Sequence, residues 1–514
     1  MFVRKKINKS GLISVQIIDK SSGSYKVVKT IGSSYDDQIV TSLVRTGHDW
    51  IRTQQGLVDV FDLYSQEQEE LELTEHLLSK IENVLINGTQ LILDKVYRSI
   101  GFDAVNDDIL KFLVIARLSK PLSKSGTVDY LKSYFDEDIK LHKIYRYLDK
   151  LHKSQQDIIQ EISVQHTKKV LGGSIGLLFY DVTTLYFETD YGDDLRENGF
   201  SKDGKHSQPQ VVLGLLVSKE GYPLSYSIFN GSQFEGRTMI PVVEDFVKKF
   251  KLDDFIIVAD SGLLNKKNIE LLTSFGHKYI LGARIKSESK DIKDWLFSLE
   301  KTDGKFFEKS KNSNERLIIN YSAKRAKKDS HNREKGVKRL EKEFKKGNIT
   351  KEQINKKGYN KFLELSNNVS VKISTDKKKE DEKWDGLKGY ITNTDLKPNQ
   401  VYEHYNGLWV IENAFRITKS KIELRPMFHF TENRIQAHIC ICFIAYKMYK
   451  ELERILKSKN IKISVDKVLE IAKTITTLKI RLINTNKTIY KTMILSQNHK
   501  KIEGLFDENF WKTV

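Results

Sequence analysis

Two apolar runs of this chain each lead directly into an aspartate. Leu177–Tyr180 is followed by Asp181, and Phe255–Ala259 is followed by Asp260. Short apolar runs bounded by polar residues predict buried strands. A carboxylate left unpaired at the end of a buried strand is costly, so its charge has to be compensated. A divalent cation is the simplest compensation, and Mg²⁺ or Mn²⁺ prefers such oxygen ligands.

A third acid, Glu412, lies in a segment with helical periodicity. Tyr405, Glu412 and Lys419 are seven residues apart, which predicts that they line one face of a single helix over roughly four turns. Arg416, four residues beyond Glu412, lies near that face. A carboxylate flanked by basic and phenolic groups suits a metal ion beside a phosphate backbone. The alternative is an ordinary amphipathic helix with side-chain pairs on its surface.

The charge of the chain favours a polyanionic partner. Its 86 Lys and Arg residues against 68 Asp and Glu give a net charge of +18. Phosphate neutralisation by such cations supplies most of the affinity in non-specific DNA binding. A Lys-rich genome would give the same excess in a protein of any function. Three carboxylates on a basic chain suit phosphodiester chemistry with two metal ions roughly 3.5–4 Å apart.

Length and composition indicate an intracellular protein with more than one core. The chain has 514 residues, of which 39% are hydrophobic. Its two cysteines do not indicate a disulfide framework or a zinc site. The N-terminus lacks the apolar stretch of a signal peptide, and no segment reaches the ~20 apolar residues of a membrane span. We therefore expect a cytoplasmic, nucleoid-associated protein without a membrane segment.

The order of the predicted elements indicates a mixed α/β domain in the middle of the chain. Three strands come first, and helix, strand, helix and strand follow. These predicted elements are, in order, 177–181, 210–218, 224–229, 238–250, 255–260, 267–275 and 279–284. A further helix is expected to begin after Lys397, because proline is tolerated in a first turn, and to carry Glu412.

Composition and periodicity divide the chain into six segments. A charge-dense stretch separates the second and third acids, and its spacing supports a helix in its middle. It serves either as a DNA-tracking surface or as a solvated helical pair. The segments are a β-rich N-terminus (1–50), a helical region (51–170), the first part of the core (171–289), a basic insertion (290–384), the second part of the core (385–450) and a C-terminal helical tail (451–514).

At these residues the chain resembles the DDE transposases of bacterial insertion sequences whose third acid lies in a YREK motif. The motif reads Tyr, two residues, Arg, three residues, Glu, six residues, Lys, and Tyr405, Glu412 and Lys419 occupy its positions. Leu408 replaces the Arg, which is similar to a longer-chained branch of the group. Other stretches similar to that branch are 180–184, 230–232, 258–263 and 424–429.

The resemblance implies a ribonuclease H-like catalytic domain with an inserted domain between its second and third acids. A β-rich N-terminus and a helical DNA-binding region would precede this domain. Asp181, Asp260 and Glu412 would be its catalytic acids and would hold two Mg²⁺ or Mn²⁺ ions.

The resemblance also implies how such a protein would bind DNA. Tyr405 and Lys419 would contact phosphates of the transposon ends, and Arg416 would supply the cation that Leu408 lacks. The helical region 51–170 would recognise the terminal inverted repeats, and a homodimer would pair two ends. The implied enzyme is a cut-and-paste transposase that cleaves double-stranded DNA and joins the freed ends to a target.

Two other functions compete with this interpretation. A haloacid-dehalogenase-type phosphatase also uses a strand-end aspartate, but it needs a second Asp where this chain has Thr183. The three-strand run after Asp181 also differs from the doubly wound parallel sheet of such enzymes. A non-catalytic DNA-binding relative, decayed or regulatory, is the second alternative, and the intact acids argue against it.

Three further residues have both a functional and a structural interpretation. His206 is either a DNA contact or a solvated loop histidine. Asp385 is either a spare acid or, as we prefer, a turn residue before glycine. Trp409, beside the acid-bearing helix, either stacks on a base or packs in the core.

Overall fold

The computed structural model divides the chain into two compact units, each assembled from separate segments. The first unit comprises Met1–Val96, Lys111–Ile144 and Leu452–Val514, and the second comprises Tyr97–Leu110 and Tyr145–Glu451. The structure describes all residues except 56–59, 202–203, 206, 253, 264, 347–353, 356–357, 367–369, 483–484, 508–509 and 512–514. His206 therefore lies outside the described residues. No described helix is both long and apolar enough to cross a membrane.

The first unit begins with an antiparallel three-stranded sheet. Its strands β1 (Phe2–Ile7), β2 (Ile13–Asp19) and β3 (Lys26–Ser34) follow one another in space as in sequence. All three strands lie in the segment 1–50, which was expected to be β-rich. Helix α1 (Asp37–Gln54) packs on this sheet, and Asp36 caps it by accepting hydrogen bonds from two backbone amides of the first turn.

The rest of the first unit is helical apart from a second small sheet. Strand β4 (Ile81–Leu85) pairs with β15 (Thr476–Arg481), which pairs in turn with β16 (Thr488–Met493). The tail from residue 451, expected to be helical, therefore also contains two strands, whose Thr and Ile residues favour extended structure. The helices that lie wholly or partly in this unit are α2 (Val60–Leu78), α3 (Gly88–Ile100), α4 (Asp108–Ser119), α5 (Lys124–Phe135), α6 (Leu141–Ser154), α15 (Glu432–Ser458), α16 (Val465–Ala472) and α17 (Gln497–Glu503).

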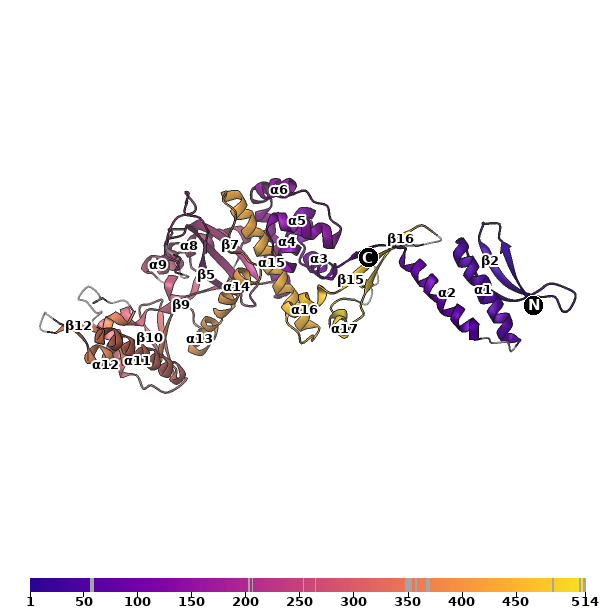
Figure 1. The fold of residues 1–514 in the computed structure, drawn as a ribbon. Helices are drawn as coiled ribbons and strands as arrows, with labels where there is room; N and C mark the ends of the chain where they lie inside the picture. The colour runs from indigo at the N-terminus through magenta and orange to yellow at the C-terminus, as the bar shows by residue number, and fades with distance from the viewer. Residues whose placement is uncertain are drawn as a thin grey trace. The chain divides into compact units, whose positions relative to one another are not determined.

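An eight-stranded mixed sheet forms the centre of the second unit (Figure 1). Its spatial order is β10-β11-β14-β9-β8-β5-β6-β7. The strands are β5 (Leu177–Tyr186), β6 (Gln210–Ser218), β7 (Pro223–Asn230), β8 (Ile256–Ala259), β9 (Lys278–Ala283), β10 (Phe306–Ser310), β11 (Arg316–Tyr321) and β14 (Leu387–Thr392). Strands β5, β8 and β9 are parallel, and every other pairing is antiparallel. The expected mixed α/β sheet is confirmed.

Two strands of the sheet come from the basic segment between the second and third acids. Strands β10 and β11 lie within 290–384 and extend the sheet through β14. The same segment contains a small hairpin, formed by β12 (Leu363–Ser366) and β13 (Ser370–Ile373), and the long helix α11 (Ala323–Lys345). The helical middle predicted for this segment is therefore confirmed.

Strand β5 has two buried faces of different kinds. Leu178, Tyr180 and Val182 pack into the main hydrophobic core, together with Ile257 and Ala259 of β8. Side chains alternate along a strand, so Phe179 and Asp181 lie on the opposite face. The strand does not end at Asp181, as the apolar run suggested, because the β-branched and aromatic residues 182–186 continue its pairing with β6.

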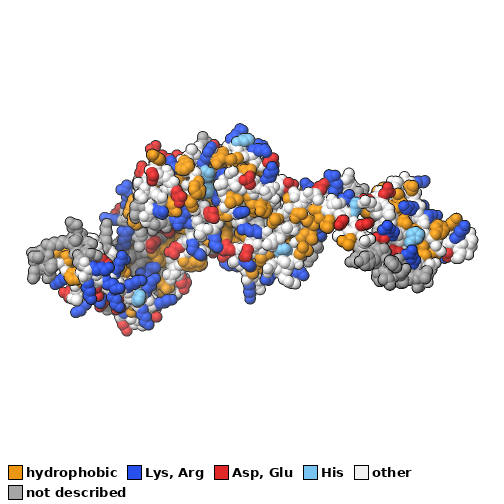
Figure 2. Space-filling model, viewed as in Figure 1, with side chains coloured by type: hydrophobic (Ala, Val, Ile, Leu, Met, Phe, Trp, Pro, Cys, Tyr) orange, Lys and Arg blue, Asp and Glu red, His pale blue; other side chains and the backbone are white. Residues whose placement is uncertain are grey.

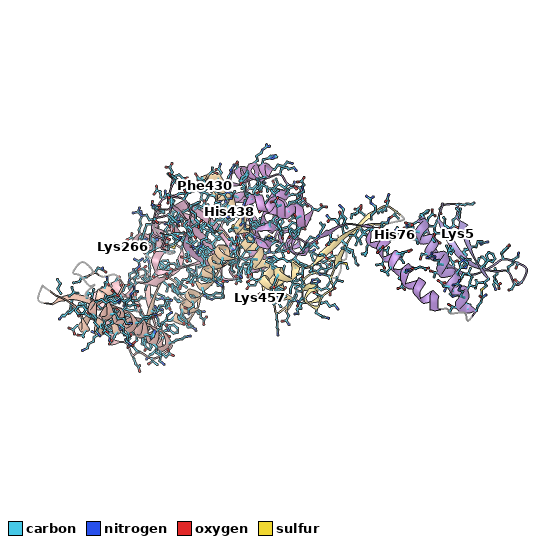
Figure 3. The ribbon with its side chains drawn as sticks, viewed as in Figure 1. Lys5, His76, Lys266, Phe430, His438 and Lys457 are labelled. Carbon is cyan, nitrogen blue, oxygen red and sulfur yellow. The ribbon has the colours of Figure 1, made fainter. Side chains whose placement is uncertain are left out.

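Helices cover both faces of the large sheet (Figure 1). The predicted helices at 238–250 and 267–275 are confirmed as α8 (Met239–Phe250) and α9 (Lys266–Ser274). The remaining helices of this unit are α7 (Gln156–Val170), α10 (Lys290–Ser298), α12 (Thr375–Glu382), α13 (Pro398–Asn406) and α14 (Trp409–Ser420), with the first part of α15. On α15, His438 is buried with its ring centroid 5.3 Å from that of His429 (Figure 3).

The single helix expected to carry Tyr405, Glu412 and Lys419 is two helices. Tyr405 lies in α13, whereas Glu412 and Lys419 lie in α14. The break falls at Gly407 and Leu408, whose backbone angles stay helical, and a Cβ atom at Gly407 would lie 2.6 Å from the ring of Phe179. The absence of a side chain at Gly407 lets the helix junction approach β5 closely. At the junction the amides of Leu408 and Val410 bond to carbonyls three residues back, a tighter pattern than in an α-helix, so the two helices do not form one regular α-helix.

We predict that Gly214→Val destabilises the second unit by about 1–3 kcal/mol, because overpacking forces buried neighbours to shift. A Cβ atom at position 214 would lie 2.5 Å from the hydroxyl of Tyr180, which is fully buried. Calorimetric melting of the full-length protein should show a lower transition temperature. Gly176→Ala is the control, since a Cβ there meets nothing within 4 Å. Equal melting of Gly214→Val and wild type would contradict this packing.

Candidate active site

The parallel pairing of β5 with β8 brings the first two acids together. Tyr180 pairs with Ala259, so Asp181 and Asp260 are the next residues along two adjacent strands. Neighbouring strands lie about 4.8 Å apart, and both residues fall on the face opposite the main core. Asp181 is half-buried, and Asp260 is exposed just beyond the end of β8.

Tyr405 holds the carboxylate of Asp260. Its hydroxyl donates a hydrogen bond to Oδ1 of Asp260 over 2.6 Å. Burial raises the pKa of Tyr405, and the hydrogen bond to Asp260 acts in the same direction. Gly282 on β9 makes the approach possible, because a Cβ atom there would collide with the Tyr405 hydroxyl. Tyr405 is therefore a buried hydrogen-bond donor to the carboxylate of Asp260.

Glu412 lies in the first turn of α14, which packs over β5 and β6. Its side chain is exposed. The three acids thus come from three places in the fold: Asp181 from β5, Asp260 from the residue after β8, and Glu412 from α14. Within the described ranges, no three His, Cys, Asp or Glu residues form a group that could already hold a metal ion. Carboxylate oxygens such as those of the three acids are, however, the ligands that hard divalent cations prefer.

Lys388 is a residue of this site that the sequence did not single out. It lies on β14, half-buried, with its Nζ 4.5 Å from the ring centroid of Tyr405. Burial and the neighbouring Arg325 charge lower the pKa of Lys388, whereas the charges of Asp260 and Glu412 act in the opposite direction. A lysine inside the apolar strand 387–392 is the only local signal, and it does not reveal which acids lie nearby.

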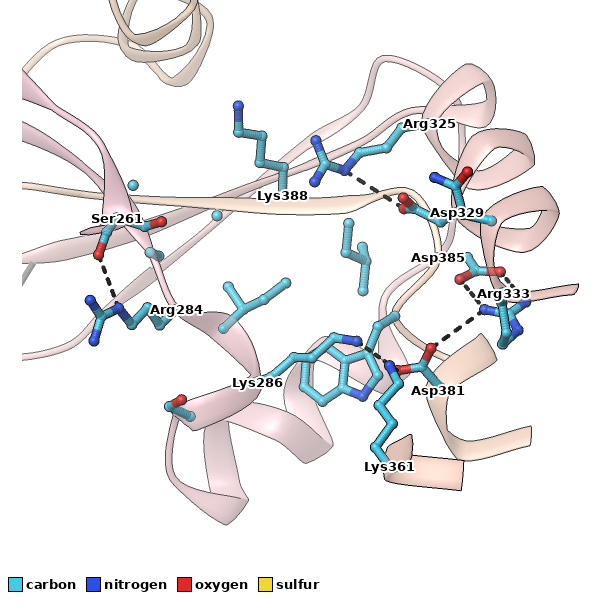
Figure 4. Close-up of a pocket in the computed structure, with 18 of the residues that line it drawn as sticks. Ser261, Arg284, Lys286, Arg325, Asp329, Arg333, Lys361, Asp381, Asp385 and Lys388 are labelled. Carbon is cyan, nitrogen blue, oxygen red and sulfur yellow. Dashed lines mark hydrogen bonds and ion pairs between the residues drawn. The ribbon is translucent and has the colours of Figure 1, made fainter. Parts of the chain in front are cut away.

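A cavity of about 630 Å³ opens beside Asp260 (Figure 4). It lies between the sheet and helix α11, and it is rich in cations. Its charged lining residues are Arg284, Lys286, Arg325, Arg333, Lys361 and Lys388, with Asp260, Asp329, Asp381 and Asp385. Figure 2 shows Lys and Arg side chains gathered over the part of this unit where α11 lies. The surroundings of the acids are therefore suited to an anionic ligand.

Asp385 forms an ion pair with Arg333 at the far side of this cavity (Figure 4). Both of its carboxylate oxygens accept hydrogen bonds from Arg333, each over 2.6 Å. Lys286 and Lys361 both donate to Oδ1 of Asp381, each over 2.8 Å. Asp385 lies in the turn that precedes β14, which confirms its interpretation as a turn residue.

The other predicted contact residues lie on the outer side of α14. Arg416 is exposed and donates a hydrogen bond to Asn413, and Lys419 is half-buried. Trp409 is 63% exposed, so its interpretation as a core residue is wrong. The helix turns its apolar side, Ile411, Ala414, Phe415, Ile417 and Thr418, toward the protein and leaves Trp409 outside.

A family model of the DDE transposase domain matches residues 172–448, which are 277 of the 514 residues. The matched range includes Asp181, Asp260 and Glu412, and it extends from just before β5 into α15. The chain belongs to this transposase family. The family comprises enzymes that cleave and transfer DNA strands and that generally use divalent metal ions.

Comparison with solved structures finds several matching chains, among them two transposase complexes with DNA. A piggyBac transposase synaptic complex with hairpin DNA has 11% sequence identity and a TM-score of 0.38, covering 71% of this chain and 69% of that one. A Mos1 transposase paired-end complex with the left transposon end has 9% identity and a TM-score of 0.16, covering 33% and 57%. Both TM-scores lie below 0.5, so the family assignment depends on the sequence match. Comparison with curated proteins finds no match.

We predict that Tyr405→Phe weakens metal-dependent DNA cleavage by about 10–100-fold, because the groups that orient a ligating carboxylate contribute that much to metal affinity or activity. The Mg²⁺ concentration for half-maximal cleavage should rise, and binding to transposon-end DNA should stay unchanged. Reduced end binding with an unchanged Mg²⁺ requirement would instead support the phosphate contact that the sequence predicts for Tyr405.

Proposed function

We propose that this protein is the cut-and-paste transposase of a bacterial insertion sequence of the YREK group. The observation that carries this proposal is the placement of Asp181 in β5 and of Asp260 directly after the adjacent parallel strand β8, with Glu412 on the helix that packs over β5 and β6. A family match that spans all three acids supports the same assignment.

The strand order supports a ribonuclease H-like catalytic domain. Strands β7, β6 and β5 are antiparallel, and β8 and β9 continue the sheet in parallel with β5. We propose that segments 171–289 and 385–450 form this domain, that 290–384 is its insertion, and that 51–170 recognises the inverted repeats. The antiparallel half of the sheet disfavours a haloacid-dehalogenase-type phosphatase, whose sheet would be parallel.

Asp181, Asp260 and Glu412 would hold the metal ions. Two Mg²⁺ or Mn²⁺ ions would activate the attacking water or 3′-hydroxyl and stabilise charge on the leaving oxygen. The fold of the protein sets the spacing and orientation of these carboxylates. The backbone pairing of β5 with β8 fixes the spacing of the aspartates, and the Tyr405 hydroxyl orients Asp260. Glu412, exposed on the first turn of α14, would complete the set.

DNA would bind on the side of the sheet where the acids and the cation-rich cavity lie. Lys419 and Arg416 on α14 would contact the backbone of the transposon ends, and inverted repeats and target DNA would be the double-stranded substrates. A homodimer would pair the two ends. Strand cleavage would release a 3′-hydroxyl, which would then attack a phosphodiester bond of the target.

Glu412→Gln should abolish metal-dependent cleavage, by about 10³-fold or more, because metal ligands contribute several kcal/mol to stabilising the transition state. The assay uses DNA carrying the ends of the protein's own element, with Mg²⁺ or Mn²⁺, and measures cleavage and end binding separately. Binding should persist in the variant. Glu403→Gln, an exposed glutamate on α13, is the matched control and should cleave like wild type.

Each other outcome of this assay has a distinct meaning. Cleavage that survives Glu412→Gln would place the third acid elsewhere. End binding by the wild type without any cleavage would support the non-catalytic, regulatory alternative. Asp181→Asn provides a second variant for the same comparison.

A further inference from the structure

Lys388 has no direct ion-pair partner among the described residues, although the charges of Asp260 and Glu412 act on it from a distance. Within this described part of the chain, no hydrogen bond or ion pair joins its ammonium group to a carboxylate, and its recorded partners are the rings of Tyr405 and Tyr390, at 4.5 and 5.8 Å. The side chain is half-buried on β14. A partly buried ammonium group without a directly paired anion is unfavourable, so an anionic ligand in contact with Lys388 would stabilise this arrangement.

A second cation lies beside Lys388. Arg325 of α11 lines the same cavity, and Figure 4 shows the Arg325 and Lys388 side chains directed to the same side of it. Arg325 makes an i,i+4 ion pair with Asp329 at 3.7 Å, a separation at which its outer nitrogens remain available. Two like charges placed side by side repel each other, and a phosphate between them would remove that repulsion.

The position of this cation pair relative to the acids suggests which anion it binds. Lys388 contacts the ring of Tyr405, whose hydroxyl binds Asp260, and it experiences the charges of both Asp260 and Glu412. An anion held by Lys388 would therefore lie at the edge of the three-acid site. In the proposed reaction, the anion at that place is a phosphodiester of the DNA strand that is cut.

We propose that Lys388, with Arg325 beside it, binds a non-bridging phosphate oxygen of the cleaved strand and replaces the arginine that the YREK motif has at position 408. This inference rests on the proposed function. Leu408 is 8% exposed and cannot serve as a cation. Arg416, which the sequence suggested as the substitute, donates its hydrogen bond to Asn413 on the exposed side of α14. Lys388, by contrast, reaches the site from strand β14 rather than from α14.

The first test compares Lys388→Met and Lys388→Arg in the full-length protein. Single-turnover cleavage of end DNA should fall by about 10²-fold in Lys388→Met, the typical loss when one preorganised donor to a reacting phosphoryl or acyl group is removed. Lys388→Arg keeps the charge and should recover at least part of that loss. Lys309→Met is the matched control, because Lys309 is also half-buried in this sheet over an aromatic ring, that of Trp295, on edge strand β10.

A substrate change shows whether Lys388 touches the phosphate. Neutral methylphosphonates replace, one at a time, the phosphates flanking the cleavage site on the cut strand. At the contacted phosphate, the substitution should slow wild type by about 10²-fold but slow Lys388→Met only slightly further, because the interaction is already lost. Losses that multiply at every position would overturn the proposal and leave Lys388 with a structural role.

The remaining outcomes also decide the proposal. Cleavage by Lys388→Met equal to that of Lys309→Met would overturn it while leaving the proposed function intact. A wild type that does not cleave end DNA would instead refute the proposed function, and this inference with it. Wild type and Asp181→Asn assayed in parallel separate these two failures.

Discussion

The parallel pairing of β5 with β8 is the constraint on which the site depends. Backbone hydrogen bonds fix Tyr180 opposite Ala259, and this register alone makes Asp181 and Asp260 neighbours. A one-residue slip would turn one of the aspartates into the hydrophobic core, so burial of the alternate residues enforces the arrangement. Phe179, on the same face as Asp181, then packs against the junction of α13 and α14, which brings the helix carrying Glu412 over the strand.

The cavity beside Asp260 has paired charges on one side and an excess of cations on the other. The far side of the cavity is neutralised internally, since Arg333 pairs with Asp385 and two lysines share Asp381. The near side, at Lys388 and Arg325, carries positive charge next to Asp260. Metal ions and a DNA strand would add positive and negative charge to the same edge. Asp260, a candidate metal ligand, and the cations Lys388 and Arg325, candidate phosphate contacts, therefore line the same cavity.

Much of the core was predictable from sequence, and the parts that were not have physical reasons. Strand β8 is buried on both sides, so its apolar run marks its true end. Asp181 interrupts the apolar pattern of β5, but pairing with β6 carries the strand on to Tyr186. The seven-residue spacing of Tyr405 and Glu412 assumed one regular α-helix, whereas a tighter hydrogen-bonded turn at Gly407 and Leu408 separates α13 from α14. Lys388 reaches the acids through tertiary contact, which no local pattern records.

The central claim is that Asp181, Asp260 and Glu412 surround one metal centre when DNA is bound. The most direct measurement is iron-mediated cleavage of the protein backbone, in which Fe²⁺ replaces Mg²⁺ in the complex with transposon-end DNA and cuts the chain near its ligands. The account predicts cuts close to residues 181, 260 and 412 that excess Mg²⁺ suppresses. Cuts at 181 and 260 accompanied by cuts near 381–385, with none near 412, would contradict it.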